Sequence, residues 1–545
     1  MTSSLFWLAA LGPAALALVG IWARNAADLR PGAVGRWAVG AGAVTVAAAG
    51  LTTIAVIVKG SISTPLIGAG GIGFSLYVDA LSTSLFCLVA FIGLVVVIYS
   101  RNYLAGDPGH ARFLRWLCLT LASILTVIIS GNMLLFALSW VLTSVSLHRL
   151  LVFYSERPAA ILAARKKFIA SRIGDICLIV AMVLLYGLFG SLEYKALFNG
   201  TETLTEGGQV PGAVHAISLL LVVAALLKSA QFPLHGWLLE VMETPTPVSA
   251  LLHAGIINAG GFLILRFSDI ISLSTPALET MAIVGGFTAL FGSAVMLTQT
   301  SIKVSLAYST IGQMGFMMLQ CGLGAFSAAL LHLIGHSLYK AHAFLTSGSV
   351  VELARASWIP GPVAHPHPAR LAIAITMLLA IALAVSAIFG AGLLEQPGVF
   401  ATGAVVLLGL THLVSNALDE PINLYVVGRT LAVAVLVGLA YFGLQWTTAH
   451  LMAGSLPPTE SLRGPLDLLI VALVILSFGA VMILQTLMPN RLREPRWQAL
   501  YTHLANGLYV NTLANRLVIR FWPSPAPKVG RPSYAQTNFD TGGAS

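Results

Sequence analysis

The sequence carries very little charge for its length. Asp, Glu, Lys and Arg make up 9% of its 545 residues, whereas hydrophobic residues make up 57%. Soluble domains contain about 25% charged residues, so this composition excludes a water-soluble protein. The chain has long apolar runs from end to end, and it is predicted to be an all-α polytopic membrane protein.

Cysteine is also scarce. Cys87, Cys118, Cys177 and Cys321 stand singly in apolar runs, without the paired spacing of a disulfide framework or a thiolate metal site. The chain contains no Walker motif, no His-Glu-x-x-His pair and no serine nucleophile elbow. Residues 68–73 match the Gly-x-Gly-x-x-Gly fingerprint, but they fall between two apolar runs instead of in a βαβ unit. We interpret them as a flexible outward loop and expect no cofactor or metal in this chain.

Apolar windows long enough to cross a bilayer recur about fifteen times. The first window has no charged segment before it, so we expect a retained first span instead of a cleaved signal, with the N-terminus outside. The predicted spans are 4–23, 37–58, 78–99, 113–130, 132–153, 169–190, 212–231, 247–267, 276–298, 302–320, 325–348, 370–391, 399–417, 428–447 and 465–487.

Basic residues gather in alternate loops, as the positive-inside rule requires of cytoplasmic segments. These are Arg24, Arg30 and Arg36, then Arg101, Arg112 and Arg115, then Arg157, Arg165, Lys166 and Lys167. Segments 190–212 and 448–463 fall on the opposite side, and the C-terminus falls inside. The net charge of +9 therefore reflects membrane topology and anionic lipid, and we expect no nucleic-acid partner.

The C-terminal region differs from the spans. Residues 489–522 are predicted to form an amphipathic helix on the cytoplasmic surface, where a partner is able to dock. Residues 523–545 are rich in Pro, Gly, Ser and Thr, and we expect disorder there.

Lys228 is the most informative residue, because it ends a long apolar run and a charge at bilayer depth normally has a function. Pro233, Pro245 and Pro247 follow it and predict a broken helix before His253. Glu240 lies in this interrupted stretch. The alternative is that Lys228 extends to the membrane interface and Glu240 is merely cytoplasmic.

A second cluster consists of His332, His336 and Lys340, spaced four residues apart on one helical face, which Tyr339 is predicted to share. Buried groups of this kind exchange protons near neutral pH, so the spacing indicates a proton relay. A zinc site and a purely structural histidine pair are the alternatives.

Other ionisable residues carry weaker signals. Lys303 opens a predicted span and, taken alone, favours an interfacial position. Asp175 and Arg172 are spaced for an intrahelical ion pair, which is as compatible with structure as with function. The signals of His342, His412 and Asp79 are weaker still.

These features resemble the proton-translocating, antiporter-like membrane subunits of complex I and of Mrp-type cation/proton antiporters. The matching stretches are Lys-Ser-Ala-Gln-Phe-Pro-Leu from Lys228, Pro-Thr-Pro-Val-Ser-Ala-Leu-Leu-His up to His253, 303–313 and 332–350. The resemblance implies two inverted five-helix repeats with broken helices, at 111–267 and 268–420. Transmembrane helices within residues 1–110 precede the repeats, and further transmembrane helices within residues 421–488 follow them. It assigns the ion pathway to Lys228, His253, Lys303, His332, His336 and Lys340, with Asp175, Glu240 and Tyr339 as possible accessories.

Two departures from that family matter. Complex I members carry a glutamate after the tryptophan of the fifth helix, paired with the broken-helix lysine, but here Val141 follows Trp140. The second repeat's broken helix normally holds a lysine, and residues 388–395, taken as that helix, hold none.

The short chain, which lacks a long lateral helix, is most similar to the membrane subunits of two-component DAB inorganic-carbon accumulation systems. That resemblance implies a cytoplasmic partner, the zinc carbonic-anhydrase-like DabA, whose CO₂ hydration is driven by a gradient of protons or Na⁺ across the bacterial inner membrane. This chain would itself be no enzyme. A complex I subunit, a standalone antiporter and a structural anchor are the alternatives. Sealing of Lys228, His332 and His336 among aliphatic side chains would contradict ion conduction.

Overall fold

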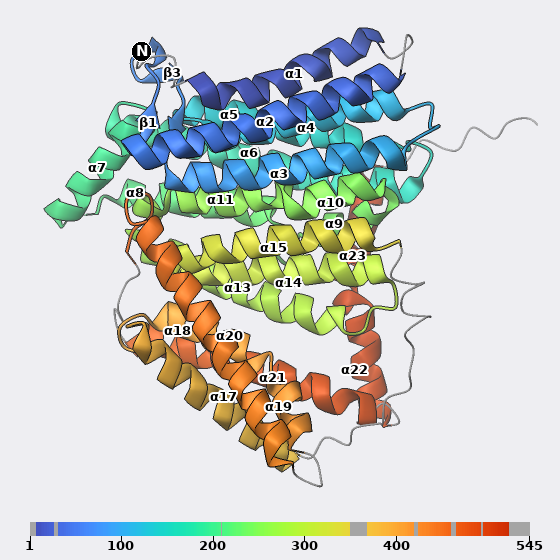
Figure 1. Ribbon diagram of the computed structural model, residues 1–545, viewed down its shortest axis with the longest axis vertical. Helices are drawn as coiled ribbons and strands as arrows, with labels where there is room; N and C mark the ends of the chain where they lie inside the picture. Colours follow the sequence, from blue (N-terminus) through green and yellow to red (C-terminus); the bar gives the residue numbers. More distant parts are fainter. Residues whose placement is uncertain are drawn as a thin grey trace, which may run out of the picture.

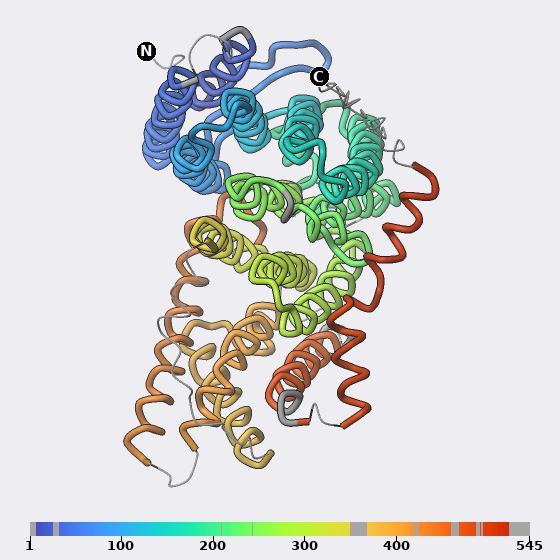
Figure 2. Tube along the Cα trace, turned by 90° about the vertical axis from the view of Figure 1, so that its right-hand side faces the viewer, coloured from blue at the N-terminus to red at the C-terminus, as the bar shows by residue number. Residues whose placement is uncertain are grey.

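The computed structural model describes residues 7–26, 31–208, 210–348, 368–418, 423–458, 465–491 and 494–522. Helices α1 to α15 lie side by side in one block, and helices α17 to α21 form a second block beside them (Figure 1). Figure 2 looks roughly along the helix axes of the first block and shows the last helices crossing the end that faces the viewer. The predicted all-α membrane fold is confirmed.

The first part of the chain forms six helices and four short strands. They are α1 (Leu8–Ala26), α2 (Pro31–Lys59), β1 (Ile62–Ser63), β2 (Ile67–Ala69), β3 (Ile72–Phe74), β4 (Tyr77–Val78), α3 (Ala80–Tyr103), α4 (His110–Ile129), α5 (Met133–Leu151) and α6 (Pro158–Phe189). The glycine-rich segment is a hairpin of β2 and β3 and not a flexible loop. Gly70 and Gly71 adopt positive φ at its turn, and the Leu192 N–H donates to the Gly71 carbonyl at 3.0 Å. We call this end of the bundle the strand end.

Helix α6 begins about ten residues earlier than the predicted span, so the prediction of a loop around residue 166 is wrong. Arg165, Lys166 and Lys167 lie inside α6 and are 9%, 8% and 3% exposed. Pro158 starts the helix, because its fixed φ suits the first helical turn. The long aliphatic stems of Arg165, Lys166 and Lys167 allow these side chains to cross apolar surface before they reach polar partners.

The next segment contains the predicted broken helix. Its elements are α7 (Tyr194–Gly207), α8 (Gly212–Lys228), α9 (Gly236–Leu239), the 3₁₀ helix η2 (Glu240–Glu243), α10 (Thr246–Ala254), the 3₁₀ helix η3 (Ile256–Asn258), α11 (Ala259–Arg266) and α12 (Ser268–Ser272). The chain leaves helical geometry after Lys228, where Ala230 has a positive φ, and resumes it at Gly236. Proline at 233 cannot donate a helical hydrogen bond, which favours the interruption.

Helices α13 (Thr275–Met296), α14 (Ile302–Gly322) and α15 (Phe326–Thr346) complete the first block. Helices α13 and α14 approach so closely that a methyl group at Gly315 would lie 2.5 Å from the backbone nitrogen of Ala289. Glycine at this position therefore sets the spacing of two helices that flank the central residues.

The second block consists of α17 (Pro368–Ile388), α18 (Pro397–Leu408), α19 (Thr411–Ala417), α20 (Leu424–Leu451) and α21 (Pro465–Arg491). Its broken helix is not at 388–395, as predicted, but between α18 and α19, which are bent by 46° at Gly409 and Leu410. Residues 388–395 instead end α17, where Gly390 has a left-handed φ of 62°, and lead to Pro397 at the start of α18.

The C-terminal segment is not one amphipathic helix. It forms α22 (Pro495–Ala505), the 3₁₀ helix η4 (Gly507–Tyr509) and α23 (Val510–Phe521), which run across the end of the first block opposite the strand end (Figures 1 and 2). Positive φ angles at Gly507, Leu508 and Tyr509 separate the helices. We call this the terminal-helix end. The predicted disordered tail, 523–545, lies outside the described residues.

Each predicted span contains a helix. Among the described residues, ten helices are long and apolar enough to cross a membrane, or eleven with the bent α18–α19 pair. Helices α1 and α8 are apolar but shorter. The total of fifteen spans therefore stays a prediction.

Candidate functional site

Lys228 lies at the C-terminal end of α8, just before the break. Its ammonium is 4.2 Å from the ring centroid of Trp140 on α5, a residue that is only 2% exposed. An ammonium over an indole face inside the bundle is stabilised by the ring's quadrupole. The break and this contact hold the charge against the protein, and the side chain does not extend along the bundle surface.

The acidic side chain that interacts electrostatically with Lys228 comes from α6. Asp175 is 4% exposed, forms an ion pair with Arg172 at 2.5 Å and interacts electrostatically with Lys228. Val141, where the complex I subunits carry glutamate, is apolar. A carboxylate of α6 thus interacts with Lys228, although the position of Val141 on α5 offers none.

Lys167 is a buried charge that the sequence reasoning missed. Its ammonium donates to the backbone carbonyl of Ser144 at 2.6 Å and to the Ser144 hydroxyl at 2.7 Å. It also interacts electrostatically with Lys228 and Asp175. The proline at position 158 was the available signal for an early helix start.

Glu240 does not reach Lys228. It forms an ion pair with Lys166 at 2.6 Å and accepts hydrogen bonds from the side-chain amides of Asn511 at 3.2 Å and Asn515 at 2.9 Å. Lys166 also donates to both asparagines, at 2.7 and 2.6 Å. A methyl group at Gly236 would overlap the Asn511 side chain, so α23 lies directly on the broken segment. Glu240 therefore belongs to a cluster that joins the last helix to the break.

His253 lies on α10 and is completely buried. Its Nδ1 is 2.9 Å from the Thr310 hydroxyl of α14, and its ring stacks on Phe344 with centroids 4.3 Å apart. The Nε2 atom is buried and has no hydrogen-bond partner among the described residues. One nitrogen is thus held in place while the other is free to exchange a proton.

The three residues predicted to share a face of α15 do so. Lys340 is fully buried and donates to the Ser309 hydroxyl at 2.7 Å. The His332 and His336 rings have centroids 6.3 Å apart, and His332 Nδ1 is 2.9 Å from the Gln320 side-chain oxygen. Tyr339 does not share the buried face as predicted, because it lies a quarter turn away and is 58% exposed.

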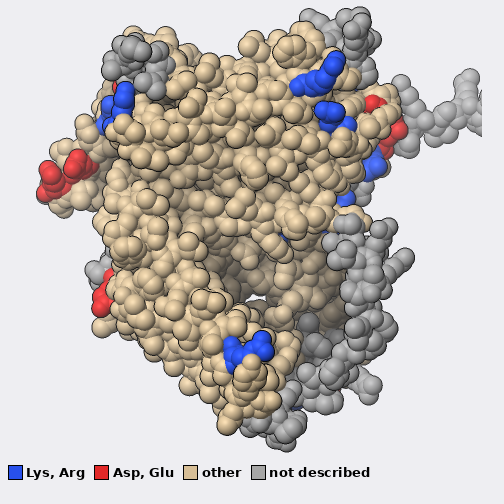
Figure 3. Space-filling model, viewed as in Figure 1, with Lys and Arg blue, Asp and Glu red and all other residues tan. Residues whose placement is uncertain are grey.

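A cavity of about 530 Å³ adjoins His332 and His336. Its polar lining includes Gln313, Gln320 and Tyr441, and the rest of the lining is largely apolar. Because one water occupies about 30 Å³ in the liquid, this volume has room for several. Figure 3 shows the molecule hollowed between the two blocks. His332 and His336 therefore line a space with room for several waters and are not sealed among aliphatic side chains.

Lys303 lies apart from this line. Its ammonium is 3.3 Å from the Thr246 hydroxyl, at the start of α10, and the side chain is partly exposed. This position fits the interfacial reading. Lys303 thus contacts the helix that carries His253, but it contacts that helix at Thr246.

The break in the second block carries no lysine. His412 follows it on α19, is exposed, and has its Nε2 3.2 Å from the Asn416 amide nitrogen. No lysine occurs between Lys340 and Lys528. In the second block, the helix is therefore bent without a lysine at the bend.

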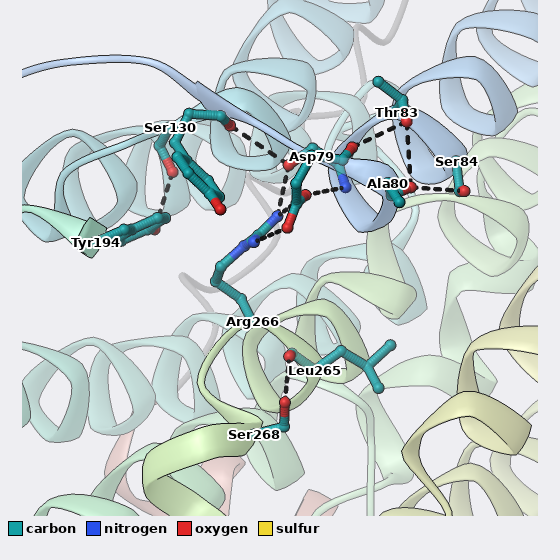
Figure 4. Close-up of polar contacts among 11 residues, drawn as sticks. Asp79, Ala80, Thr83, Ser84, Ser130, Tyr194, Leu265, Arg266 and Ser268 are labelled. Atoms are coloured by element: carbon teal, nitrogen blue, oxygen red, sulfur yellow. Dashed lines mark hydrogen bonds and ion pairs between the residues drawn. The ribbon is translucent and has the colours of Figure 1, made fainter. Parts of the chain in front are cut away.

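Asp79 and Arg266 form a buried ion pair at the strand end (Figure 4). Arg266 donates two hydrogen bonds to the carboxylate, at 2.8 and 2.9 Å, and the Ser82 N–H donates a third at 2.8 Å. Burial alone would raise the pKa of Asp79, but the guanidinium, together with hydrogen bonds from Ser82 and Ser455, holds this pKa below its ordinary value. The pair fastens the start of α3 to the end of α11, which is a structural role.

Charged side chains are sparse on the bundle's surface and gather mainly near its ends (Figure 3). Within the described ranges, no group of three His, Cys, Asp or Glu side chains is arranged to hold a metal ion.

Comparison with protein families identifies the matching region. The transmembrane family "NADH:quinone oxidoreductase/Mrp antiporter" matches residues 130–359. The N-terminal family of complex I chain 5 matches residues 66–114. The first match includes Lys228, His253 and the α15 residues.

Longer matches are found among individual proteins. Two described as probable inorganic carbon transporter subunits are DabB2 of Halothiobacillus neapolitanus, 41% identical over 85% of this chain and 83% of that one, and DabB of Hydrogenovibrio crunogenus, 37% identical over 84% and 86%. Chain 5 of a Synechocystis NAD(P)H-quinone oxidoreductase is 41% identical over only 50% of this chain and 40% of its own.

Solved structures share the fold. The Mrp complex of Dietzia sp. aligns with a TM-score of 0.62 at 23% identity, covering 95% of this chain and 59% of that one. An archaeal membrane-bound sulfane sulfur reductase aligns with a TM-score of 0.56 at 19% identity, covering 93% and 99%. The antiporter-like architecture therefore extends over nearly the whole chain.

Proposed function

Because the chain belongs to the DabB family of inorganic carbon transporter subunits, we propose that it is the ion-conducting membrane subunit of an energy-coupled inorganic-carbon pump. The observation that carries the proposal is the set of buried basic side chains His253, His336 and Lys340, together with the cavity that His332 and His336 line. Ionisable groups at membrane depth are costly and mark ion pathways.

The proposed path starts at Lys228 and Asp175. Polar side chains join this site to α15: the Ser229 hydroxyl donates to the Ile257 carbonyl at 3.1 Å, and the Asn258 amide donates to the Ser337 hydroxyl at 2.7 Å. Water beside these groups would pass a proton toward Lys340, because hydroxyls and waters both donate and accept hydrogen bonds.

From Lys340 the proton would pass to His253 and His336, and then through His332 into the cavity. The buried Nε2 of His253 and both nitrogens of His336 lack hydrogen-bond partners among the described residues. A neutral imidazole accepts a proton on one nitrogen and releases it from the other, which suits a relay.

The partner would be a cytoplasmic, carbonic-anhydrase-like zinc protein of the DabA type that carries out CO₂ hydration. We place the cytoplasm at the terminal-helix end, because the basic loops around residues 101–115 and 157 lie there and the positive-inside rule favours that side. Helices α22 and α23 would form the docking surface. The cluster of Lys166, Glu240, Asn511 and Asn515 would transmit movement from the partner to the break.

Co-expression with a zinc protein of the DabA type tests this function. In a host without its own carbonic anhydrases, the pair should accumulate bicarbonate, and a protonophore should abolish the accumulation. Lys228→Ala should abolish it while leaving the complex intact on size-exclusion chromatography. The matched control is Lys195→Ala, which removes an exposed lysine of α7. Full accumulation with Lys228→Ala would refute ion conduction through this site.

A respiratory or antiporter subunit is the second candidate, favoured by the match to chain 5 of the NAD(P)H-quinone oxidoreductase. It predicts co-purification with redox subunits, or Na⁺-dependent proton exchange by this chain alone in vesicles. Replacing Na⁺ by choline in the bicarbonate assay also shows which ion gradient drives accumulation: accumulation should persist if protons drive it and stop if Na⁺ drives it.

A further inference from the structure

A basic pocket lies between α5 and α6, outside the line of residues described above. It is a cavity of about 200 Å³. The lining residues are Ser144, Val145, His148, Arg149, Lys167, Phe168 and Arg172. Four of these seven side chains are basic and none is acidic.

The described side chains balance only part of the positive charge in this pocket. Asp175, just outside the lining, forms an ion pair with Arg172. Arg149 lies with Arg115 around the ring of Trp116, at 5.8 and 4.8 Å from its centroid, so a further cation is near. The Nδ1 atom of His148 and the Nε atom of Arg172 are buried without hydrogen-bond partners in the described part of the chain. Unpartnered nitrogens beside excess positive charge suit an oxyanion.

The mouth of the pocket opens sideways, onto the membrane-facing surface of the bundle. Val145 and Phe168 at the mouth are 44% and 41% exposed. Apolar side chains continue the surface beside it, with Leu142 54% and Ile176 62% exposed. His148 and Arg149 lie in the last turn of α5, so the basic groups are near the level expected for lipid headgroups.

We propose that this pocket binds the phosphate of an anionic phospholipid, with its acyl chains on the adjoining apolar surface. Basic pockets between membrane helices recognise anionic headgroups in this way. A free oxyanion such as phosphate or bicarbonate has the same binding chemistry, but the sideways mouth and apolar flank favour the lipid.

The bound phosphate would also act on the ion path, a consequence that rests on the proposed function. Lys167 is close enough to Lys228 for the two charges to interact, and both interact with Asp175. An anion beside Lys167 would offset the repulsion between the two ammonium groups. Lipid in the pocket would therefore favour the charged state of both lysines.

Lipid binding is measured on the purified complex in nanodiscs with equal amounts of phosphatidylglycerol and phosphatidylcholine, by native mass spectrometry of the retained lipid. Phosphatidylglycerol should be retained preferentially. Arg149→Gln should weaken retention about fivefold, since one basic residue near a membrane surface contributes about 1 kcal/mol. Arg429→Gln, an exposed arginine of α20 outside the pocket, is the control and should retain the lipid.

Val145→Trp provides a second test, because it blocks the mouth without changing charge and should also displace the lipid. Equal retention of both lipids, or unchanged retention in both variants, would overturn the proposal. Binding of millimolar phosphate or bicarbonate without retention of phosphatidylglycerol would overturn it in favour of a free oxyanion. The readout does not depend on bicarbonate transport, so failure here is distinguishable from failure of the proposed function.

Discussion

The two broken helices of this chain differ in what surrounds the break. At the first, Lys228 lies on a buried tryptophan and interacts with Asp175. At the second, between α18 and α19, His412 of α19 is exposed, and Gly409 lines the cavity that His332 and His336 of α15 also line. A helix bends because of its backbone, whereas charge transfer needs buried ionisable side chains. The two breaks share an interrupted backbone, but among the described residues only the first has a lysine that interacts with a carboxylate.

The largest expected effect concerns the acid at the first break. Asp175→Asn should abolish bicarbonate accumulation as completely as Lys228→Ala, because the lysine loses its acidic partner. Val141→Glu in the same variant should restore part of the activity by returning a carboxylate to α5. Glu156→Gln, in an exposed loop, is the control. Full activity of Asp175→Asn would show that Lys228 works without this acid.

Next in size is the buried pair that fastens the first block at the strand end. Asp79→Asn should destabilise the protein by about 3–5 kcal/mol, because it leaves Arg266 buried without its counter-charge. The pKa of Asp79 is lowered in the folded state, so its contribution is present above the unfolded pKa of about 3.9 and is lost as pH falls through the folded pKa. Thermal unfolding in detergent measures both effects; an unchanged midpoint at pH 7 would contradict them.

A smaller effect is expected from helix spacing in the first block. Gly315→Ala should cost about 1–3 kcal/mol, because the new methyl group meets the backbone of α13. Gly286→Ala is the matched control, since its methyl would lie 3.6 Å from the nearest side-chain atom. Equal unfolding temperatures for the two variants would argue against tight packing of α13 on α14.

The terminal helix should respond only locally. Asn515→Ala removes hydrogen bonds to both Lys166 and Glu240, and a lost bond to a charged group costs about 1.5–3 kcal/mol locally. We expect faster hydrogen exchange in 507–522 and weaker partner binding, with the rest of the bundle unchanged. Thr512→Ala, on the exposed face of α23, should leave exchange as it is.

The smallest effect is predicted at the second break. His412→Ala should change bicarbonate accumulation by less than about twofold, since loss of an exposed polar residue is normally within 0.5 kcal/mol. A loss as large as that of Lys228→Ala would mean that both breaks conduct, and the distinction between the two blocks would fail.

The sequence by itself determined the membrane fold, the position of the first break and the common face of His332, His336 and Lys340. These follow from local rules: apolar length, proline and helical periodicity. Only the tertiary structure decided which groups meet. It brought Asp175 of α6 toward Lys228, paired Glu240 with Lys166 instead, buried Lys167, turned Tyr339 outward and moved the second break to Gly409. Contacts between helices depend on how each helix is rotated and where it begins, and neither is encoded within a single apolar run.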